Sequence, residues 1–284
     1  MCVKKHLKFH GFEQYYKKNK EMVSKNATKC QLSKDCNNAD KKVQIAVEST
    51  IALTINERYR LNILCTCKQI EALAVGYLVC EGLISSFDEI KTVELKEKDK
   101  VHISTNSSSE DFFYWNEIRT SGCVGIKQQY EQINKIIESN LKISPEIIFK
   151  AQEKMNQLST IWKISGGAHM SGLFNSDGKL LFYSEDVGRH NTLDKIIGEA
   201  VIEGENLSNC FVVTSGRLSS AMISKLVRAE VPIIVSISAP TAQGLEIAEK
   251  SHMTVVGFTR HPFFNVYTFP ERIIFQVNSE GNVT

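Results

Sequence analysis

The feature of this 284-residue chain that most restricts its fold is an alternation of short apolar and amphipathic segments in the C-terminal half. Three apolar runs, at residues 210–214, 233–237 and 254–258, have the length of buried strands. Helical patterns near residues 219–229 and 242–250 separate them. Strands and helices that alternate at this spacing indicate a parallel sheet covered by helices. We therefore expect an α/β fold.

Polar turns follow each of these expected strands. Their sequences are Ser215-Gly216-Arg217-Leu218-Ser219, Ser238-Ala239-Pro240-Thr241 and Gly257-Phe258-Thr259-Arg260-His261. Ligands of parallel sheets bind at the carboxyl ends of the strands. The first of these turns is suited to a phosphate, because it combines a glycine, an arginine and the start of a helix. Ser219 could instead be a simple helix cap beside a surface arginine, but three polar turns on one edge favour an anion site.

A dense charged cluster lies at residues 185–195, with the sequence EDVGRHNTLDK. We expect Asn191 to cap a helix with Asp194 as its capping-box partner. Two interpretations stay open. Either Asp186, Arg189 and Asp194 only brace the loop through ion pairs, or Arg189 and His190 lie beside an anionic ligand. Upstream, the glycine turn at residues 165–168 ends in His169, which is a weak signal by itself.

The N-terminal half has a different pattern. Residues 1–40 are rich in lysine and poorly periodic, so we expect a loosely ordered basic arm. Alternating apolar residues predict strands over 43–55, and a helix follows over 68–80. A strand pair at 90–95 and 101–104 completes a smaller lobe, residues 41–143. Ser144-Pro145-Glu146 starts a helix and opens the main domain, residues 144–284.

The eight cysteines differ in the residues that surround them in the sequence. Cys80 and Cys210 lie in apolar runs and are expected in the core. Cys65 and Cys67 could hold zinc, but no second pair stands at the usual spacing, so no structural metal is predicted. Cys123 lies between two glycines in a polar segment, residues 105–126, that we expect to be a mobile loop. An accessible thiol near basic residues is a candidate nucleophile, although an incidental loop thiol has the same appearance.

Charge and hydropathy exclude several classes of protein. The chain has 34 basic and 32 acidic residues, so no net field indicates a nucleic-acid partner. The first residues contain no apolar segment typical of a secretory leader, and no apolar run has the length of a membrane span. We expect a cytoplasmic protein with reduced cysteines.

Taken together, the motifs resemble a known family. In order along the chain they are TSGC at 120–123, GGAH at 166–169, EDVGRHN at 185–191, SGR at 215–217, SAPT at 238–241 and GFTR at 257–260. This series resembles the formate dehydrogenase accessory sulfurtransferase family (FdhD). The segment GYLVCEGLI at 76–84 resembles an earlier helix of that family, and the likeness extends over residues 43–277.

The resemblance implies a cytidine-deaminase-like three-layer α/β/α sandwich with a smaller N-terminal β-rich lobe, usually as a homodimer. It implies a sulfur carrier that takes sulfur from a cysteine desulfurase as a persulfide on Cys123. The acceptor would be molybdenum bis(molybdopterin guanine dinucleotide), before its insertion into formate dehydrogenase. The residues expected to bind this cofactor are Phe258, Thr259, Arg260, His261, Pro262, Phe263, Ser215, Gly216, Arg217, Ser219, Arg189, His190 and His169. Phosphates would lie against the 215–219 turn and Arg189, with Arg260 beside the same anion.

One position departs from the family pattern. Many members carry a second cysteine in the loop, where this chain has Ile126, so a carrier persulfide is retained but a resolving thiol is not. Two alternatives remain. One is a chaperone that binds the cofactor without moving sulfur. The other is a zinc-dependent hydrolase of the deaminase type, although Met170 follows His169 where that chemistry needs a nearby glutamate.

Overall fold

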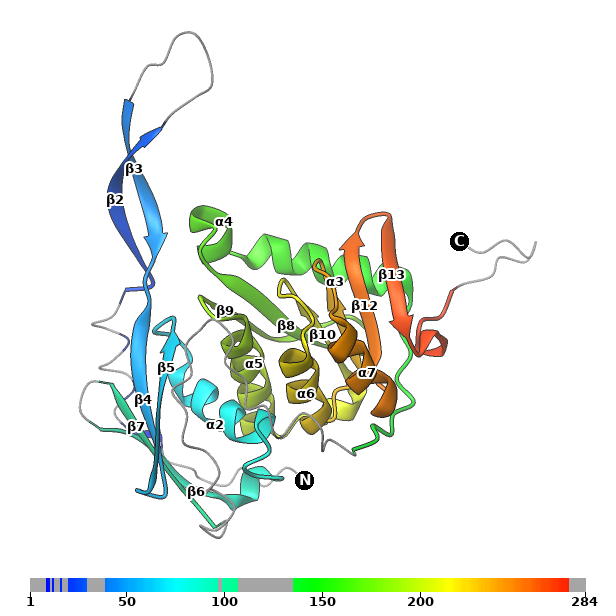
Figure 1. Ribbon diagram of the computed structural model, residues 1–284, viewed down its shortest axis with the longest axis horizontal. Helices are drawn as coiled ribbons and strands as arrows, with labels where there is room; N and C mark the ends of the chain where they lie inside the picture. Colours follow the sequence, from blue (N-terminus) through cyan, green and yellow to red (C-terminus); the bar gives the residue numbers. More distant parts are fainter. Residues whose placement is uncertain are drawn as a thin grey trace.

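The computed structural model describes residues 9–10, 12, 16, 20–29, 39–96, 99–106 and 135–275 (Figure 1). A six-stranded sheet in the order β13-β12-β11-β10-β8-β9 forms the centre of the C-terminal half. Its strands are β8 (His169–Asn175), β9 (Leu180–Asp186), β10 (Cys210–Thr214), β11 (Ile233–Ser236), β12 (Thr254–Arg260) and β13 (Phe263–Thr268).

The sheet is mixed, which corrects the expectation of a parallel sheet. β10, β11 and β12 run parallel to one another, as the helical crossovers between them require. β8 and β9 form an antiparallel hairpin, and so do β12 and β13. Short turns join each of these two pairs, and a short connection between neighbouring strands can only make an antiparallel pair.

Helices cover both faces of this sheet. α3 (Pro145–Leu158) lies on one face, and the short α4 (Ile161–Ser165) follows it. α5 (Arg189–Glu203), α6 (Ser220–Arg228) and α7 (Ala242–Lys250) lie on the other. Alternate strand residues supply the two apolar cores: Val213 and Val235 pack on the α3 side, and Val212 and Ile234 on the α5 side. The main domain is therefore a three-layer arrangement. Its likeness to cytidine deaminases stays a prediction.

The N-terminal half forms a β-rich lobe. Its five-stranded sheet has the order β1-β6-β7-β4-β5. The strands are β1 (Phe9–His10), β4 (Ser49–Ile55), β5 (Tyr59–Cys65), β6 (Ile90–Lys96) and β7 (Lys100–Thr105). One helix, α2 (Ile70–Cys80), is buried along almost its whole length and packs against α5 of the main domain. The lobe and the main domain thus share one apolar core.

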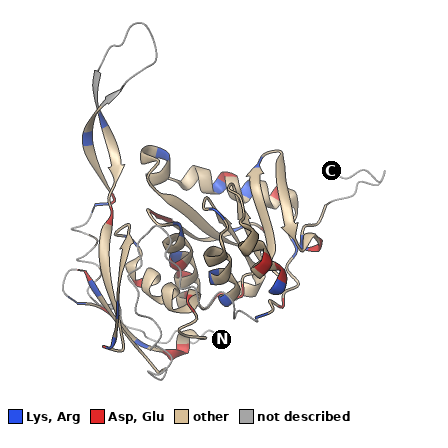
Figure 2. Ribbon diagram, viewed as in Figure 1, with Lys and Arg blue, Asp and Glu red and all other residues tan. Residues whose placement is uncertain are grey.

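Two features differ from the expected domain limits. The expected loosely ordered arm contains β2 (Met22–Lys29), which pairs antiparallel with β3 (Ala39–Ala46) in register from Met22–Ala46 to Lys29–Ala39. Alternating side chains and a full ladder of backbone bonds form this hairpin, which projects from the body in Figure 1. At the other limit, Leu141 and Ile143 already pack in the core on the α3 side, so the main domain begins before residue 144. Basic and acidic residues are interspersed along the helices (Figure 2).

Candidate functional site

The turns that the sequence singled out meet at one edge of the central sheet. The carboxyl ends of β9, β10, β11 and β12 point to this edge, and β8 starts from it because β8 runs antiparallel to β10. The edge therefore brings together His169, Arg189 and the turn that begins at Ser215. His169 and Ser215 are 46 residues apart in the sequence.

The start of β8 is hydrogen-bonded to the turn after β10. His169 Nδ1 is 3.3 Å from Ser215 Oγ, and the same hydroxyl accepts a hydrogen bond from Met170 N–H at 3.0 Å. Ser215 N–H donates to the Met170 carbonyl at 2.9 Å. The turn after β11 joins the same network, since Ser238 Oγ donates to the Ser215 carbonyl at 3.1 Å. The imidazole is thus held at the site edge by a defined hydroxyl.

Gly216 allows the Arg189 side chain to lie directly on the turn. A Cβ atom at Gly216 would be 3.0 Å from Arg189 Cβ and 3.2 Å from its Cδ, closer than normal van der Waals contact. A side chain at position 216 would therefore displace the arginine. Arg189 is the first residue of α5, so the free N–H groups of the first turn of this helix lie beside Arg189.

The electrostatics of the edge favour an anion. The pKa of His169 is lowered, first by partial burial and then by the positive charge of Arg189, with a smaller contribution from Arg217. Asp186 acts in the opposite direction. Two guanidinium groups thus act on the same imidazole, and the opposing carboxylate of Asp186 is itself paired with Lys195. A phosphate or carboxylate would be stabilised there.

The charged cluster at 185–195 divides into structural and site residues. Glu185 accepts hydrogen bonds from the backbone N–H groups of Thr160, Ile161 and Trp162, and so fixes the start of α4. Asp194 pairs with Lys225 of α6 at 2.8 Å in a buried cluster with Glu81. Asp194 therefore forms an ion pair, but with a distant lysine of α6 that the sequence did not indicate and not within the loop at 185–195.

Asp186 joins the two parts of the molecule. Its carboxylate is fully buried and 2.5 Å from Lys195 Nζ. It also accepts from Thr66 N–H of the N-terminal lobe at 2.9 Å and from Gly188 N–H at 2.8 Å. Asn191 donates to the same carboxylate at 2.8 Å, so the expected N-cap role of Asn191 is wrong. The N-cap residue is Gly188, and Asn191 is the third residue of α5, with its amide donating to buried acceptors. His190 lies half-buried in the first turn of α5.

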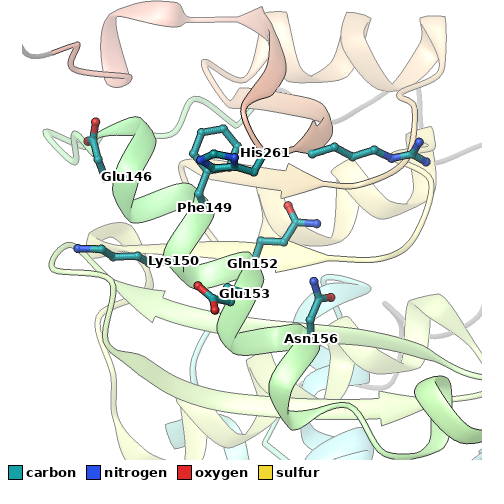
Figure 3. Close-up of a pocket in the computed structure, with 8 residues that line it drawn as sticks. Glu146, Phe149, Lys150, Gln152, Glu153, Asn156 and His261 are labelled. Atoms are coloured by element: carbon teal, nitrogen blue, oxygen red, sulfur yellow. The ribbon is translucent and has the colours of Figure 1, made fainter. Parts of the chain in front are cut away.

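Arg260 is the last residue of β12, and His261 follows it in the turn to β13. They line a cleft of about 610 Å³ beside α3, together with Glu146, Phe149, Lys150, Gln152, Glu153 and Asn156. The His261 ring packs edge-on against Phe149, with 5.0 Å between ring centroids (Figure 3). The lining of this cleft includes neither Arg189 nor the 215–219 turn. The pairing of β12 with β13 has a register shift between Gly257 and Arg260, just before the turn between these strands. The expected place of Arg260 beside the anion at Arg189 stays a prediction.

The remaining expected residues differ in exposure. Phe258 is 47% exposed with a φ of 52°, and its N–H donates to the Ser238 carbonyl at 3.2 Å. Phe263 is 77% exposed, and Pro262 beside it is also exposed. Thr259 is fully buried. Arg217 is exposed, and Ser219 is the N-cap residue of α6 without a capping bond from its side chain.

The four cysteines in the described ranges are all buried: Cys65, Cys67, Cys80 and Cys210. The core location expected for Cys80 and Cys210 is confirmed. Burial raises the pKa of the Cys65 thiol to about 12 and of the Cys210 thiol to about 11. Such thiols are poor nucleophiles at neutral pH. Cys123 and residues 107–134 around it lie outside the described residues.

Within the described ranges, no cluster of three or more His, Cys, Asp or Glu side chains is arranged to hold a metal ion. No helix in the same ranges has the length and apolar character needed to cross a membrane.

Comparison with known proteins shows the family of this chain. Residues 46–274 match the model of the FdhD/NarQ family. The chain is 37% identical to Sulfur carrier protein FdhD of Saccharolobus solfataricus over 202 residues, which are 71% of this chain and 78% of the relative. It is 34% identical to Sulfur carrier protein FdhD of Bacillus subtilis, covering 81% and 90% of the two chains. A crystal structure from Desulfotalea psychrophila, described as a formate dehydrogenase accessory protein, has the same fold, with a TM-score of 0.73 and 24% identity over 90% of this chain and 100% of that one. The chain belongs to the FdhD/NarQ family.

Proposed function

We propose that this chain is a sulfur carrier in formate dehydrogenase maturation. It takes sulfur on Cys123 from a cysteine desulfurase and passes it to molybdenum bis(molybdopterin guanine dinucleotide). The names of the curated relatives support the carrier role. The structural observation that carries the proposal is the sheet edge at which Arg189 lies on Gly216 beside a hydrogen-bonded His169. A positively charged edge of this kind is suited to the diphosphate of a guanine nucleotide.

Sulfur transfer takes place in two steps. The Cys123 thiolate attacks the outer sulfur of the desulfurase persulfide, so a new S–S bond forms and the donor cysteine leaves as a thiolate. In the second step the outer sulfur enters the molybdenum centre as sulfide. This requires two electrons, which we assign to the reduced metal, and it regenerates the Cys123 thiolate. The four described cysteines are buried, which leaves the first step to a cysteine outside the described ranges.

The carrier role is tested by sulfur loading. The protein is incubated with a cysteine desulfurase and cysteine, and its mass is measured without reductant. The wild type should gain the mass of one sulfur atom, and Cys123→Ala should show no such gain. The matched variant Cys210→Ala should gain the same mass as wild type, because Cys210 is buried. Equal loading of wild type and Cys123→Ala would refute Cys123 as the carrier. Binding of the guanine nucleotide without any loading in wild type would favour the chaperone alternative.

The anion site is tested separately by pyrophosphate affinity. Arg189→Lys keeps the charge but loses the planar fork that binds two phosphate oxygens, so affinity should fall about tenfold. Arg260→Lys is the matched control, because Arg260 lines the cleft beside α3. Its pyrophosphate affinity should stay within about twofold of wild type, a change below half a kcal/mol. An equal loss in both variants would show that the two arginines share one anion.

A further inference from the structure

A row of hydroxyl side chains crosses the central sheet next to the candidate site. The row consists of register neighbours on four successive strands: Ser184 of β9, Ser171 of β8, Thr214 of β10 and Ser236 of β11. None of the four is more than 2% exposed. The row two residues further from the site edge is entirely apolar: Phe182, Leu173, Val212 and Ile234. The sheet therefore changes from apolar to polar immediately before the turns of the site begin.

Part of this row forms a hydrogen-bonded path between two site residues. Thr192 Oγ1 of α5 donates to the Arg189 carbonyl at 2.7 Å and is 2.6 Å from Ser171 Oγ. Ser171 Oγ donates to Thr214 Oγ1 at 2.9 Å, and Thr214 Oγ1 also accepts a hydrogen bond from Gly216 N–H at 3.2 Å. The three hydroxyl oxygens therefore lie in succession between the Arg189 carbonyl and the Gly216 amide, with Thr214 Oγ1 accepting from both Ser171 and Gly216. The path connects the backbone of Arg189 to that of Gly216.

The chemistry of the path indicates a geometric role. Buried hydroxyls give no net advantage over apolar side chains of the same shape, and valine or alanine would suit the apolar sheet face around them. A buried hydrogen-bond network does, however, favour one arrangement of the groups it joins. Here the joined groups are Arg189 and Gly216, which come from different turns and are in close contact. Ser236 fixes the other side of the glycine, since its Oγ donates to the Gly216 carbonyl at 2.7 Å.

We propose that Ser171, Thr192 and Thr214 are positioning residues of the anion site. They hold the backbones of Arg189 and Gly216 at the spacing that binds a nucleoside diphosphate. All three are buried, so they do not touch the ligand and act only through the residues that do. The proposal rests on the proposed function, because it takes this edge of the sheet to be the diphosphate site.

The first test measures the affinity of the intact protein for GDP by calorimetry. Ser171→Ala and Thr192→Val should each weaken binding about tenfold, the factor that corresponds to one hydrogen bond. Thr192→Ser keeps the hydroxyl and should restore the affinity to within about twofold. Ser184→Ala is the matched control, because the buried Ser184 hydroxyl has no hydrogen-bond partner in the described part of the chain. Its affinity should equal that of wild type.

A second control distinguishes a general loss of stability from a specific effect on GDP affinity. Thr254→Val removes a buried hydroxyl that donates to the Phe269 carbonyl at 3.0 Å, at the end of β12 away from the site. It should lower the unfolding midpoint about as much as Thr192→Val but leave the affinity for GDP unchanged. If Thr254→Val and Thr192→Val weaken GDP binding equally, the positioning role is overturned.

The second test does not depend on any ligand. Hydrogen exchange of the Gly216 amide should become about tenfold faster in Ser171→Ala than in Ser184→Ala, because the path that holds this amide is broken. Unchanged exchange would overturn the positioning role whatever the GDP result. A third outcome combines faster exchange in Ser171→Ala with no GDP binding by the wild type. That outcome would support the positioning of the turn and refute GDP as the ligand of this edge.

Discussion

His169 is the residue whose titration reports on the site. It is partly buried, hydrogen-bonded to Ser215, and subject to the positive charges of Arg189 and Arg217. Burial and like charge both disfavour the imidazolium, so the pKa of His169 is lowered from its ordinary value. The ring is therefore neutral at neutral pH and can accept a hydrogen bond from a hydroxyl or a protonated ligand.

The lowered pKa of His169 predicts a pH dependence of stability. The unfolded chain binds a proton on this histidine near pH 6.5, and the folded chain binds it only at lower pH. The unfolded state therefore holds more protons as the pH falls through this window, and stability decreases. The His169→Asn variant should lack this decrease, as measured by urea unfolding between about pH 7 and pH 5.

A bound anion should reverse the effect. Saturating pyrophosphate places negative charge beside Arg189 and should raise the pKa of His169 toward its ordinary value, as followed by NMR of the imidazole protons. An unchanged titration curve in the presence of saturating pyrophosphate would place the anion away from His169.

At the scale of elements, the packing of α2 on α5 decides how the N-terminal lobe sits on the main domain. Two glycines face each other there: a Cβ atom at Gly76 would be 1.7 Å from the Asp194 carbonyl oxygen, and one at Gly198 would be 1.9 Å from the Ala72 carbonyl oxygen. The helices thus touch through their backbones. This contact also places Asp194 beside Lys225 of α6 in the buried ionic cluster.

The Gly76→Ala variant should therefore be strongly destabilised. The added methyl group cannot fit without separating α2 from α5, and overpacking of this kind costs about 3 kcal/mol or more. Urea unfolding gives the change in the free energy of unfolding. Gly167→Ala is the matched control, because its Cβ would meet Ala46 at 3.3 Å, where a small adjustment suffices. Equal stability of the two variants would mean that the helix crossing tolerates wider spacing.

At the scale of the whole molecule, Asp186 links the lobe, the sheet and the site. Its carboxylate bonds to Thr66 in the lobe and to Gly188 at the start of α5, so one side chain sets the position of both. Lys195 completes the link by donating to the Thr66 carbonyl at 3.0 Å. The cost of burying this pair is offset because both ions have several hydrogen-bond partners.

The Asp186→Asn variant should lose about 3–5 kcal/mol of stability, because it leaves the Lys195 ammonium buried without its counter-charge. The double variant Asp186→Asn/Lys195→Met removes both charges and should recover part of this loss. Urea unfolding of the two variants and wild type gives the comparison. A double variant less stable than Asp186→Asn alone would show that Lys195 stabilises the fold without its partner.

The sequence by itself determined the elements and the polar turns. Strand and helix periods and turn chemistry depend on neighbouring residues, so the strands that become β10, β11 and β12, the helix start at Pro145, and the buried Cys80 and Cys210 could all be predicted. The Ser215–Gly216 turn could be predicted as a site element for the same reason.

The tertiary structure alone decided which of these residues meet. The Asp186–Thr66 bond joins residues 120 positions apart, which no local pattern records. Strand direction and register shifts decide where a side chain points, and only the folded hairpin of β12 and β13 brings Arg260 to the cleft beside α3. The hydroxyls of Ser171 and Thr214 appear in the sequence as isolated polar residues, and only the register of β8 with β10 makes them one path. Pairing across a sheet is a long-range property, so the site could be predicted in its parts but not in its assembly.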